Sequence, residues 1–174
     1  MQNAVQDCNV KFVAESLIHA SAECVFAFHE LPDALARLTP RWIDARVISN
    51  PASLKPGSRA VVDIGIVPFL RVRTEAVHTI YEPPFLFEDQ QLKGPFRNWK
   101  HRHIITPESA GTRLTDAIEL EPPFGIVGRW LAPWLILPRL RRLFAYRHEV
   151  TRAWCESQSL DNSHAAPSPS PSPI

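Results

Sequence analysis

Hydrophobic residues repeat with two different periods along the chain, one before and one after Pro122-Pro123. Over residues 43–121, apolar and polar residues alternate in short runs that are separated by turns containing glycine or proline. Such alternation is typical of antiparallel β-strands. After residue 123 the apolar positions recur every 3.6 residues, the period of an α-helix. The pattern therefore predicts a run of strands followed by one long C-terminal helix.

Capping residues and prolines predict the elements that precede these strands. A strand over residues 10–20 leads to Ser21, a residue type that commonly caps a helix N-terminus. The run AECVFAFHE that follows has its apolar residues at helical spacing. Pro32 can begin a second short helix, and Pro40 ends it. We therefore expect two short helices after the first strand.

The fold class follows from this order of elements. Helices that are segregated from an antiparallel sheet of six or seven strands define an α+β fold. We expect the long helix to lie across a strongly curved sheet, and the space between them to form a small-molecule cavity lined by inward side chains. After the two short helices, the predicted strands cover residues 43–49, 58–67, 70–81, the two arms of a hairpin over 87–103, and 112–121.

The C-terminal helix is expected to run to about residue 158, with a kinked or broken approach. Pro133 and Pro138 interrupt this approach, because proline removes a helix hydrogen bond. Residues 159–174 are rich in proline and serine and have almost nothing to bury, so we expect a disordered tail after a domain over residues 10–158. One stripe of the helix carries Leu140, Leu143, Phe144, Arg147, Thr151 and Trp154.

Composition narrows the class of protein without naming a function. The chain has 174 residues and a formal net charge of +1, so its bulk charge does not favour nucleic acid as a partner. Three unpatterned cysteines and a start without a basic and apolar leader favour a reducing compartment. The longest apolar run, WLAPWLILP, is far shorter than the roughly 20 residues of a membrane-spanning helix. We therefore expect a cytoplasmic protein and leave its oligomeric state open.

The stretch FEDQQLKGPFRNWKHRH, residues 87–103, carries the most polar chemistry. Gly94-Pro95 predicts a turn between two strands, along which side chains alternate between the two faces. A turn centred on Pro95 would therefore pair side chains across the two arms. The predicted pairs are Phe87 with His103, Asp89 with His101, and Gln91 with Trp99.

Asp116 is the polar exception on the more apolar face of the strand over residues 112–121. An antiparallel return would place it beside His101 or His103. An acid in that position can fix an imidazole tautomer and raise the pKa of the imidazole. The hypothesis is a cluster of Asp89, His101, His103 and Asp116 on the concave surface, and these four are the candidate catalytic residues.

Three interpretations of this cluster remain open. The groups can be structural and satisfy one another by pairing. They can line a cavity and orient the polar end of an otherwise apolar ligand. They can also perform acid–base chemistry or hold a transition metal, but H-x-H with distant acids is a weak metal pattern. No metal and no cofactor are therefore expected.

The motif F-x-D-x-Q-x-x-G-P-F-x-x-W-x-H-x-H, residues 87–103, resembles a subgroup of the SRPBCC superfamily. That superfamily includes START lipid-transfer domains, Bet v 1-like proteins, polyketide cyclases and dehydrases, and coenzyme Q-binding proteins. Residues 22–40, 81–89 and 143–149 resemble it as well. The resemblance spans about residues 10–155 and implies a helix-grip fold around a hydrophobic tunnel. Members bind lipids, sterols, quinones or polyketides, and only some are catalysts.

The main functional hypothesis is a protein that binds a hydrophobic or aromatic small molecule between sheet and helix, for transport or sequestration. One alternative is a cyclase/dehydrase-like lyase or isomerase in which an acid-oriented histidine is the general base. Another is an accessory or interaction protein whose polar cluster is purely structural. The predicted ligand-binding residues are Phe87, Asp89, Gln91, Trp99, His101, His103, Asp116, Leu143 and Arg147.

Some other positions leave alternatives open. Arg147 is expected either to extend from the edge of the helix stripe into solvent or to enter the cavity and pair with Asp116, Asp89 or an acidic ligand. The segment Trp130–Phe144 either packs on the core or makes transient contact with a membrane. Four histidines have no predicted partner and are expected on the surface or in the core: His19, His29, His78 and His148.

Overall fold

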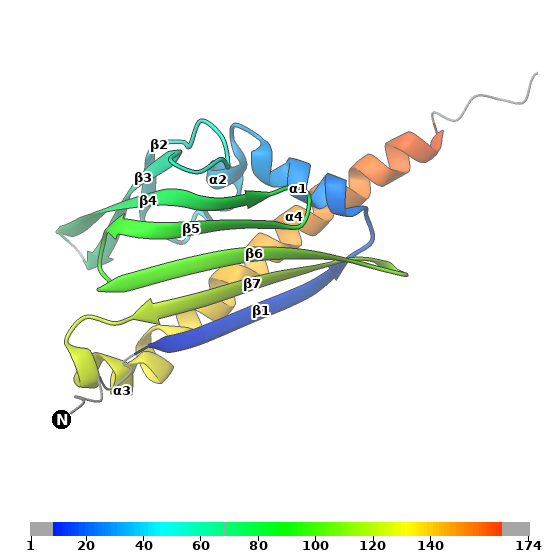
Figure 1. Cartoon of the computed structure of the whole chain (residues 1–174). Helices are drawn as coiled ribbons and strands as arrows, with labels where there is room; N and C mark the ends of the chain where they lie inside the picture. Colours follow the sequence, from blue (N-terminus) through cyan, green and yellow to red (C-terminus); the bar gives the residue numbers. More distant parts are fainter. Residues whose placement is uncertain (1–8, 68, 165–174) are drawn as a thin grey trace, which may run out of the picture.

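A computed structural model describes residues 9–67 and 69–164. They form a seven-stranded antiparallel sheet with the strand order β1-β7-β6-β5-β4-β3-β2 (Figure 1). The first strand lies at one edge of the sheet and pairs with the last strand. The strands are β1 (Val10–Ile18), β2 (Ala45–Ser49), β3 (Arg59–Val67), β4 (Leu70–Glu82), β5 (Leu86–Lys93), β6 (Asn98–Glu108) and β7 (Gly111–Glu121).

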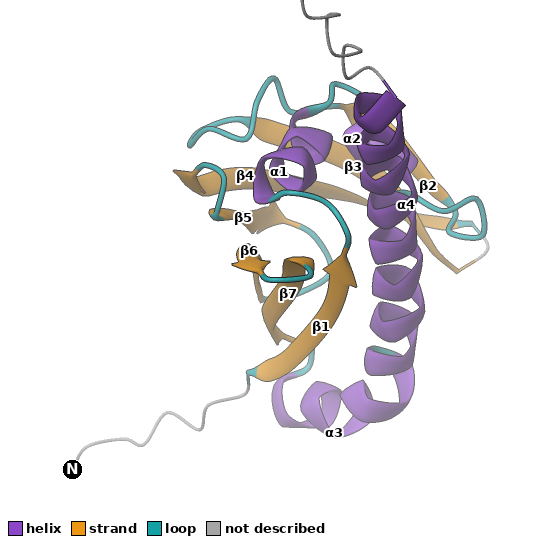
Figure 2. Ribbon diagram, turned by 90° about the vertical axis from the view of Figure 1, so that its right-hand side faces the viewer, coloured by secondary structure: helices purple, strands orange, loops and turns teal. Residues whose placement is uncertain are grey.

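The helices lie on the concave side of this sheet. Figure 2 shows the sheet curving toward the long helix α4 (Leu137–His164), with α1 (Ala22–Glu30) packed at one end of the concave side and α3 (Gly125–Leu135) at the other. The short α2 (Ala34–Arg37) follows α1. The predicted α+β fold, in which a curved sheet grips a long C-terminal helix, is thus confirmed.

The helix boundaries follow the predicted caps and prolines. Ser21 caps α1, and its side chain accepts a hydrogen bond from the backbone N–H of Cys24. The predicted break before the long helix occurs at Ile136, with Pro133 inside α3. Helix α4 continues to His164 instead of ending near residue 158. The last part of the predicted tail, residues 165–174, lies outside the described residues.

The hairpin register agrees with the prediction for two of its three pairs. Phe87 lies opposite His103, and Asp89 lies opposite His101. The ladder ends at the pair of Gln90 with Lys100, so the predicted pair of Gln91 with Trp99 is not part of it. Instead, Nε2 of Gln91 donates to the backbone oxygen of Phe96 inside the turn.

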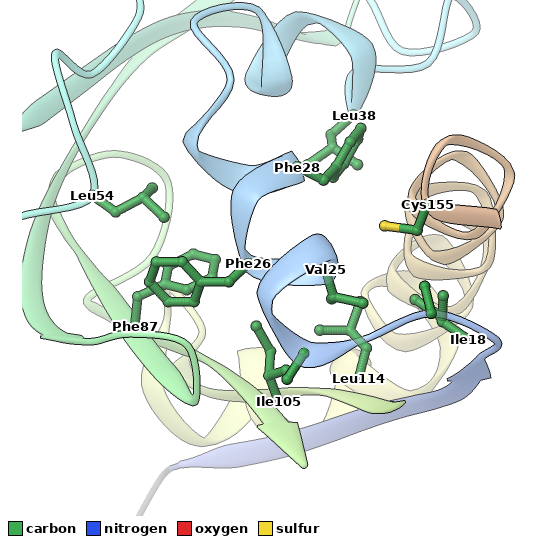
Figure 3. Close-up of a cluster of buried hydrophobic side chains, with 12 residues drawn as sticks. Ile18, Val25, Phe26, Phe28, Leu38, Leu54, Phe87, Ile105, Leu114 and Cys155 are labelled. Atoms are coloured by element: carbon green, nitrogen blue, oxygen red, sulfur yellow. The ribbon is translucent and has the colours of Figure 1, made fainter. Parts of the chain in front are cut away.

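A hydrophobic core joins α1 to the sheet and to the C-terminal half of α4. Figure 3 shows Val25 and Phe26 of α1 pointing toward side chains of the sheet, while Phe28 lies next to Leu38. Phe26 contacts Phe87 edge to face, with ring centroids 5.7 Å apart. A second apolar group surrounds Phe12, Ile118, Leu120, Leu140 and Phe144 at the other end of the helix. The polar cluster lies between these two apolar regions.

Candidate functional site

The structure brings four of the predicted polar side chains together on the concave face. Asp89 lies on β5, His101 and His103 on β6, and Asp116 on β7. Nε2 of His101 is 2.9 Å from Oδ1 of Asp116, and its Nδ1 is 3.3 Å from Oδ2 of Asp89. For His103, Nδ1 is 2.7 Å from the same Asp116 oxygen and Nε2 is 3.6 Å from Oδ2 of Asp89. The role of these residues in binding or catalysis stays a prediction.

His148 of α4 belongs to this cluster, although it had no predicted partner. Its Nε2 donates to Oδ2 of Asp116 over 2.6 Å, and its Nδ1 lies 2.8 Å from Oγ of Ser16 on β1. The helical spacing of the sequence could have indicated that residue 148 faces the sheet. Residue 148 is one helical turn after Phe144 and one turn before Thr151, both on the predicted apolar stripe.

Two further histidines surround the cluster and were also missed. His29 of α1 is buried, and its ring centroid lies 5.5 Å from that of His103. His78 of β4 is buried opposite Asp89 in the sheet ladder. His29 lay within a predicted helix and His78 within a predicted strand, and neither had a local pattern that pointed to the cluster.

Hydrogen bonding determines which groups carry charge. His101 directs one ring nitrogen at each of two carboxylates, so both nitrogens donate and the ring is an imidazolium. Burial lowers the pKa of His101, but hydrogen bonds to Asp116 and Asp89 outweigh this effect and raise the pKa from 6.5 to about 9. Burial raises the pKa of each acid, yet the imidazoles around Asp89 and Asp116 hold both pKa values well below the usual range.

His29, in contrast to His101, is an uncharged imidazole. Its Nδ1 donates to the backbone oxygen of Val25 over 2.8 Å, because a carbonyl can only accept. Burial, followed by the nearby His103, lowers the pKa of His29 from 6.5 to about 3. The ring is therefore neutral at neutral pH, and its Nε2 carries a lone pair.

Some polar atoms of this interior lack a hydrogen-bond partner among the described residues. They are Oγ1 of Thr74, Nδ1 of His78 and Nδ1 of His103. The His103 nitrogen is close to Asp116, but its direction is not that of a hydrogen bond. Thr74 and His78 are both on β4, four residues apart, and therefore on the same face as the cluster.

The other predicted ligand-binding residues lie around the cluster without bonding to it. Phe87 stacks on His103 at a centroid distance of 4.0 Å. Trp99 stacks on Phe96, and Leu143 packs against the second apolar group. Gln91 is occupied in the hairpin turn, as described above.

Arg147 enters the interior but does not pair with an acid. Its Nε donates to the backbone oxygen of Leu38 over 3.1 Å, and burial lowers its pKa. Among the described residues, no ion pair joins it to Asp89 or Asp116. Of the two positions predicted for Arg147, the structure agrees better with the interior one. The partner of the side chain is a backbone carbonyl, however, and not the predicted carboxylate.

A groove of about 410 Å³ leads from the surface to the cluster. Phe12 and Ser16 of β1 line one wall, and Leu137, Arg141 and His148 of α4 line the other. Because His148 bonds to Asp116, the groove reaches the edge of the cluster. A second hollow of about 550 Å³ lies on the outer face of the sheet and does not contact the cluster. The predicted small-molecule cavity between the sheet and α4 stays a prediction.

The family described as polyketide cyclase / dehydrase and lipid transport matches residues 18–144 of the sequence. The chain belongs to this family. No curated protein matches the sequence of this chain.

Solved structures of similar fold agree with this family. The di-domain ARO/CYC protein StfQ from the steffimycin biosynthetic pathway is 13% identical with a TM-score of 0.67, over 87% of this chain and 52% of that chain. A norcoclaurine synthase mutant from Thalictrum flavum, in complex with a transition-state analogue, is 13% identical with a TM-score of 0.65, over 87% and 96% of the two chains. A protein from Chromobacterium violaceum is 14% identical with a TM-score of 0.64, over 84% and 96%. At these identities the likeness shows the fold alone.

Proposed function

We propose that the protein binds a small hydrophobic or aromatic molecule on the concave face, with a polar group of that molecule hydrogen-bonded to the histidine–aspartate cluster. The observation that carries this proposal is a pair of buried polar atoms without a hydrogen-bond partner among the described residues, Oγ1 of Thr74 and Nδ1 of His78. A buried unpaired polar atom costs about 1–3 kcal/mol, so a fold retains it for a reason. A hydroxyl or carbonyl group of a ligand can supply the missing hydrogen bonds.

The apolar part of the ligand would contact the inner faces of β3 and β4. Val62 lies opposite Thr74, and Ile64 lies opposite Val72, on the face that carries His78. These apolar side chains are only partly buried, because α4 packs mainly on β1, α1 and α3. Apolar walls with a few convergent polar groups are typical of small-molecule sites. The family description, which names polyketides and lipid transport, supports the same class of ligand.

The geometry favours binding over base catalysis by His101. A general base needs a free lone pair, and both nitrogens of His101 face carboxylates. Both N–H groups of the protonated ring are directed at Asp89 and Asp116, so His101 can act on a ligand through its positive charge but cannot remove a proton from it. The cyclase/dehydrase alternative would therefore require another imidazole as the base.

Thermal unfolding with two probes, 2-naphthol and menadione, tests the proposal. A ligand at 100 times its Kd adds ~2.7 kcal/mol of stability, which raises the Tm of a domain of this size by about 5–10 °C. We expect such a rise with at least one probe, its loss in His78→Phe and its retention in His19→Phe, since His19 is exposed and outside the cluster. No rise in the wild type, or equal rises in both variants, would contradict the proposal.

We also propose that α3 rests on an anionic membrane surface, from which an apolar ligand can be loaded. The apolar side chains of this helix face solvent, and Trp130 and Trp134 are 77% and 80% exposed. Tryptophan side chains prefer the membrane interface. The sequence from Pro122 to Phe144 contains four arginines and no acidic residue, a charge that complements anionic lipids. Among the described residues, no helix is long and apolar enough to cross a membrane.

Sedimentation with vesicles tests this contact. The full chain should bind vesicles of phosphatidylcholine and phosphatidylserine more strongly than vesicles of phosphatidylcholine alone. The double variant Trp130→Ala/Trp134→Ala should lose this binding. Phe85→Ala is the matched control, because Phe85 is exposed in the turn between β4 and β5, at the end of the sheet away from α3 (Figure 1). Equal binding by the double variant and the wild type would contradict the contact.

A further inference from the structure

Asp89, His101 and His103 place three potential metal-ligand atoms close together on the concave face. The carboxylate oxygen and one nitrogen of each imidazole all lie within 4.8 Å of one another. Oδ2 of Asp89 is 3.3 Å from Nδ1 of His101 and 3.6 Å from Nε2 of His103. Ligands about 2.0–2.2 Å from a tetrahedral zinc ion are roughly 3.3–3.6 Å apart. Two of the three separations therefore already fit a common metal ion.

We propose that Asp89, His101 and His103 form a binding site for a divalent transition-metal ion such as Zn²⁺. Two imidazoles and one carboxylate make a ligand set that such ions prefer, and they leave positions open for a ligand or water. The proposal rests on the cluster that carries the proposed function, but it does not require the apolar ligand.

Asp116 is placed as the residue that orients both imidazole ligands. Its Oδ1 accepts from Nε2 of His101 over 2.9 Å and lies 2.7 Å from Nδ1 of His103. The nitrogen of each ring that faces Asp89 is then the one that would bind the ion, and the ion would displace the proton from Nδ1 of His101. Its Oδ2 is held in turn by His148. A carboxylate behind histidine ligands is a recurrent feature of metal sites, because it fixes the tautomer and orientation of the rings.

Charge and burial give a second, independent argument. Asp89 and Asp116 bring two negative charges into the interior, where their side chains are 19% and 3% exposed. Buried carboxylates need compensation; the His101 imidazolium supplies one positive charge, whereas a divalent ion that displaces its proton would supply two. His103, only 8% exposed, has an Nδ1 without a hydrogen-bond partner among the described residues.

Titration of the metal-free full chain with Zn²⁺ by calorimetry tests the proposal, with Co²⁺ absorption as a second readout of the ligand set. We expect one Zn²⁺ per chain, and visible absorption bands of Co²⁺ in a low-symmetry site. Asp89→Asn and His103→Gln should weaken binding at least ~100-fold. Asp116→Asn, which removes only the orienting carboxylate, should weaken it by roughly 10–100-fold.

The matched control is His19→Gln, which removes an exposed histidine that bonds to the backbone of Ala110 and should bind Zn²⁺ like the wild type. Circular dichroism of each variant establishes that it is folded. Absence of stoichiometric binding by the wild type would overturn the proposal, as would equal affinity in a folded Asp89→Asn. Binding of 2-naphthol and menadione is measured on metal-free protein, so failure of the metal site and failure of the proposed function are distinguishable.

Discussion

Nε2 of His148, on the C-terminal helix, donates to Oδ2 of Asp116, on the last strand, over 2.6 Å. This bond ties the helix to the sheet in the middle of the concave face. Asp116 also contacts His101 and His103, so one buried carboxylate holds imidazoles from two elements. The arrangement of the whole cluster therefore depends on this single acid.

Replacing Asp116 by Asn should destabilise the fold strongly. The change keeps the size of the side chain but removes the charge that the imidazoles need. Breaking a buried ion pair by removing one partner typically costs about 3–5 kcal/mol. Urea unfolding monitored by circular dichroism measures the loss. Glu119→Gln is the matched control on the same strand, because its exposed pair with Lys11 should contribute less than ~1 kcal/mol.

The stability of the protein should fall as the pH rises from about 6.5 to 9 because of His101. Its folded pKa of about 9 exceeds its unfolded value of 6.5, so its contribution is complete below pH 6.5 and is lost as the pH rises through 9. The slope for one such group reaches ~1.4 kcal/mol per pH unit. Urea unfolding across this range should show the slope in the wild type and a reduced slope in His101→Gln. Parallel profiles would contradict the assigned imidazolium.

His29 should make the stability of the protein depend on pH below pH 6.5. Its folded pKa of about 3 is below its unfolded value of 6.5, so the neutral ring contributes stability above pH 6.5 that is lost as the pH falls toward 3. The difference in unfolding free energy between the wild type and His29→Gln should therefore shrink as the pH falls below 6.5. A difference that stays constant between pH 4 and pH 7 would show that His29 is not buried as a neutral ring.

Phe28 tests the apolar core that holds α1 beside the cluster. It is fully buried and lies 5.4 Å from the ring of Trp154 on α4. Phe28→Ala should lower the unfolding free energy by about 3–5 kcal/mol. Val13→Ala, on the exposed side of β1, should change it by less than ~0.5 kcal/mol. Equal effects of the two substitutions on urea unfolding would contradict the described packing of α1.

Local periodicity was sufficient to predict much of the fold and part of the site. The two-residue period of the strands and the turn at Gly94-Pro95 placed Asp89, His101 and His103 on one face. Antiparallel return of the next strand then brought in Asp116, which is paired with His103 in the ladder. Each of these steps uses only short-range geometry.

The missing histidines depend on packing between distant elements, which no local period determines. His148 meets Asp116 only because α4 crosses the sheet at a particular height, and His29 reaches His103 because α1 packs over β6. Nδ1 of His78, which has no hydrogen-bond partner within the described part of the chain, likewise depends on how the interior is assembled. The cytoplasmic location and the disordered tail stay predictions.

The most direct test of the central claim is nitrogen-15 NMR of the histidine side chains, recorded with and without 2-naphthol. If the concave cluster binds the polar end of an aromatic molecule, the imidazole signals of His78 and His103 should shift at saturation. The signals of His19, which lies outside the cluster, should not. Unchanged His78 and His103 signals in the presence of saturating 2-naphthol would contradict the account.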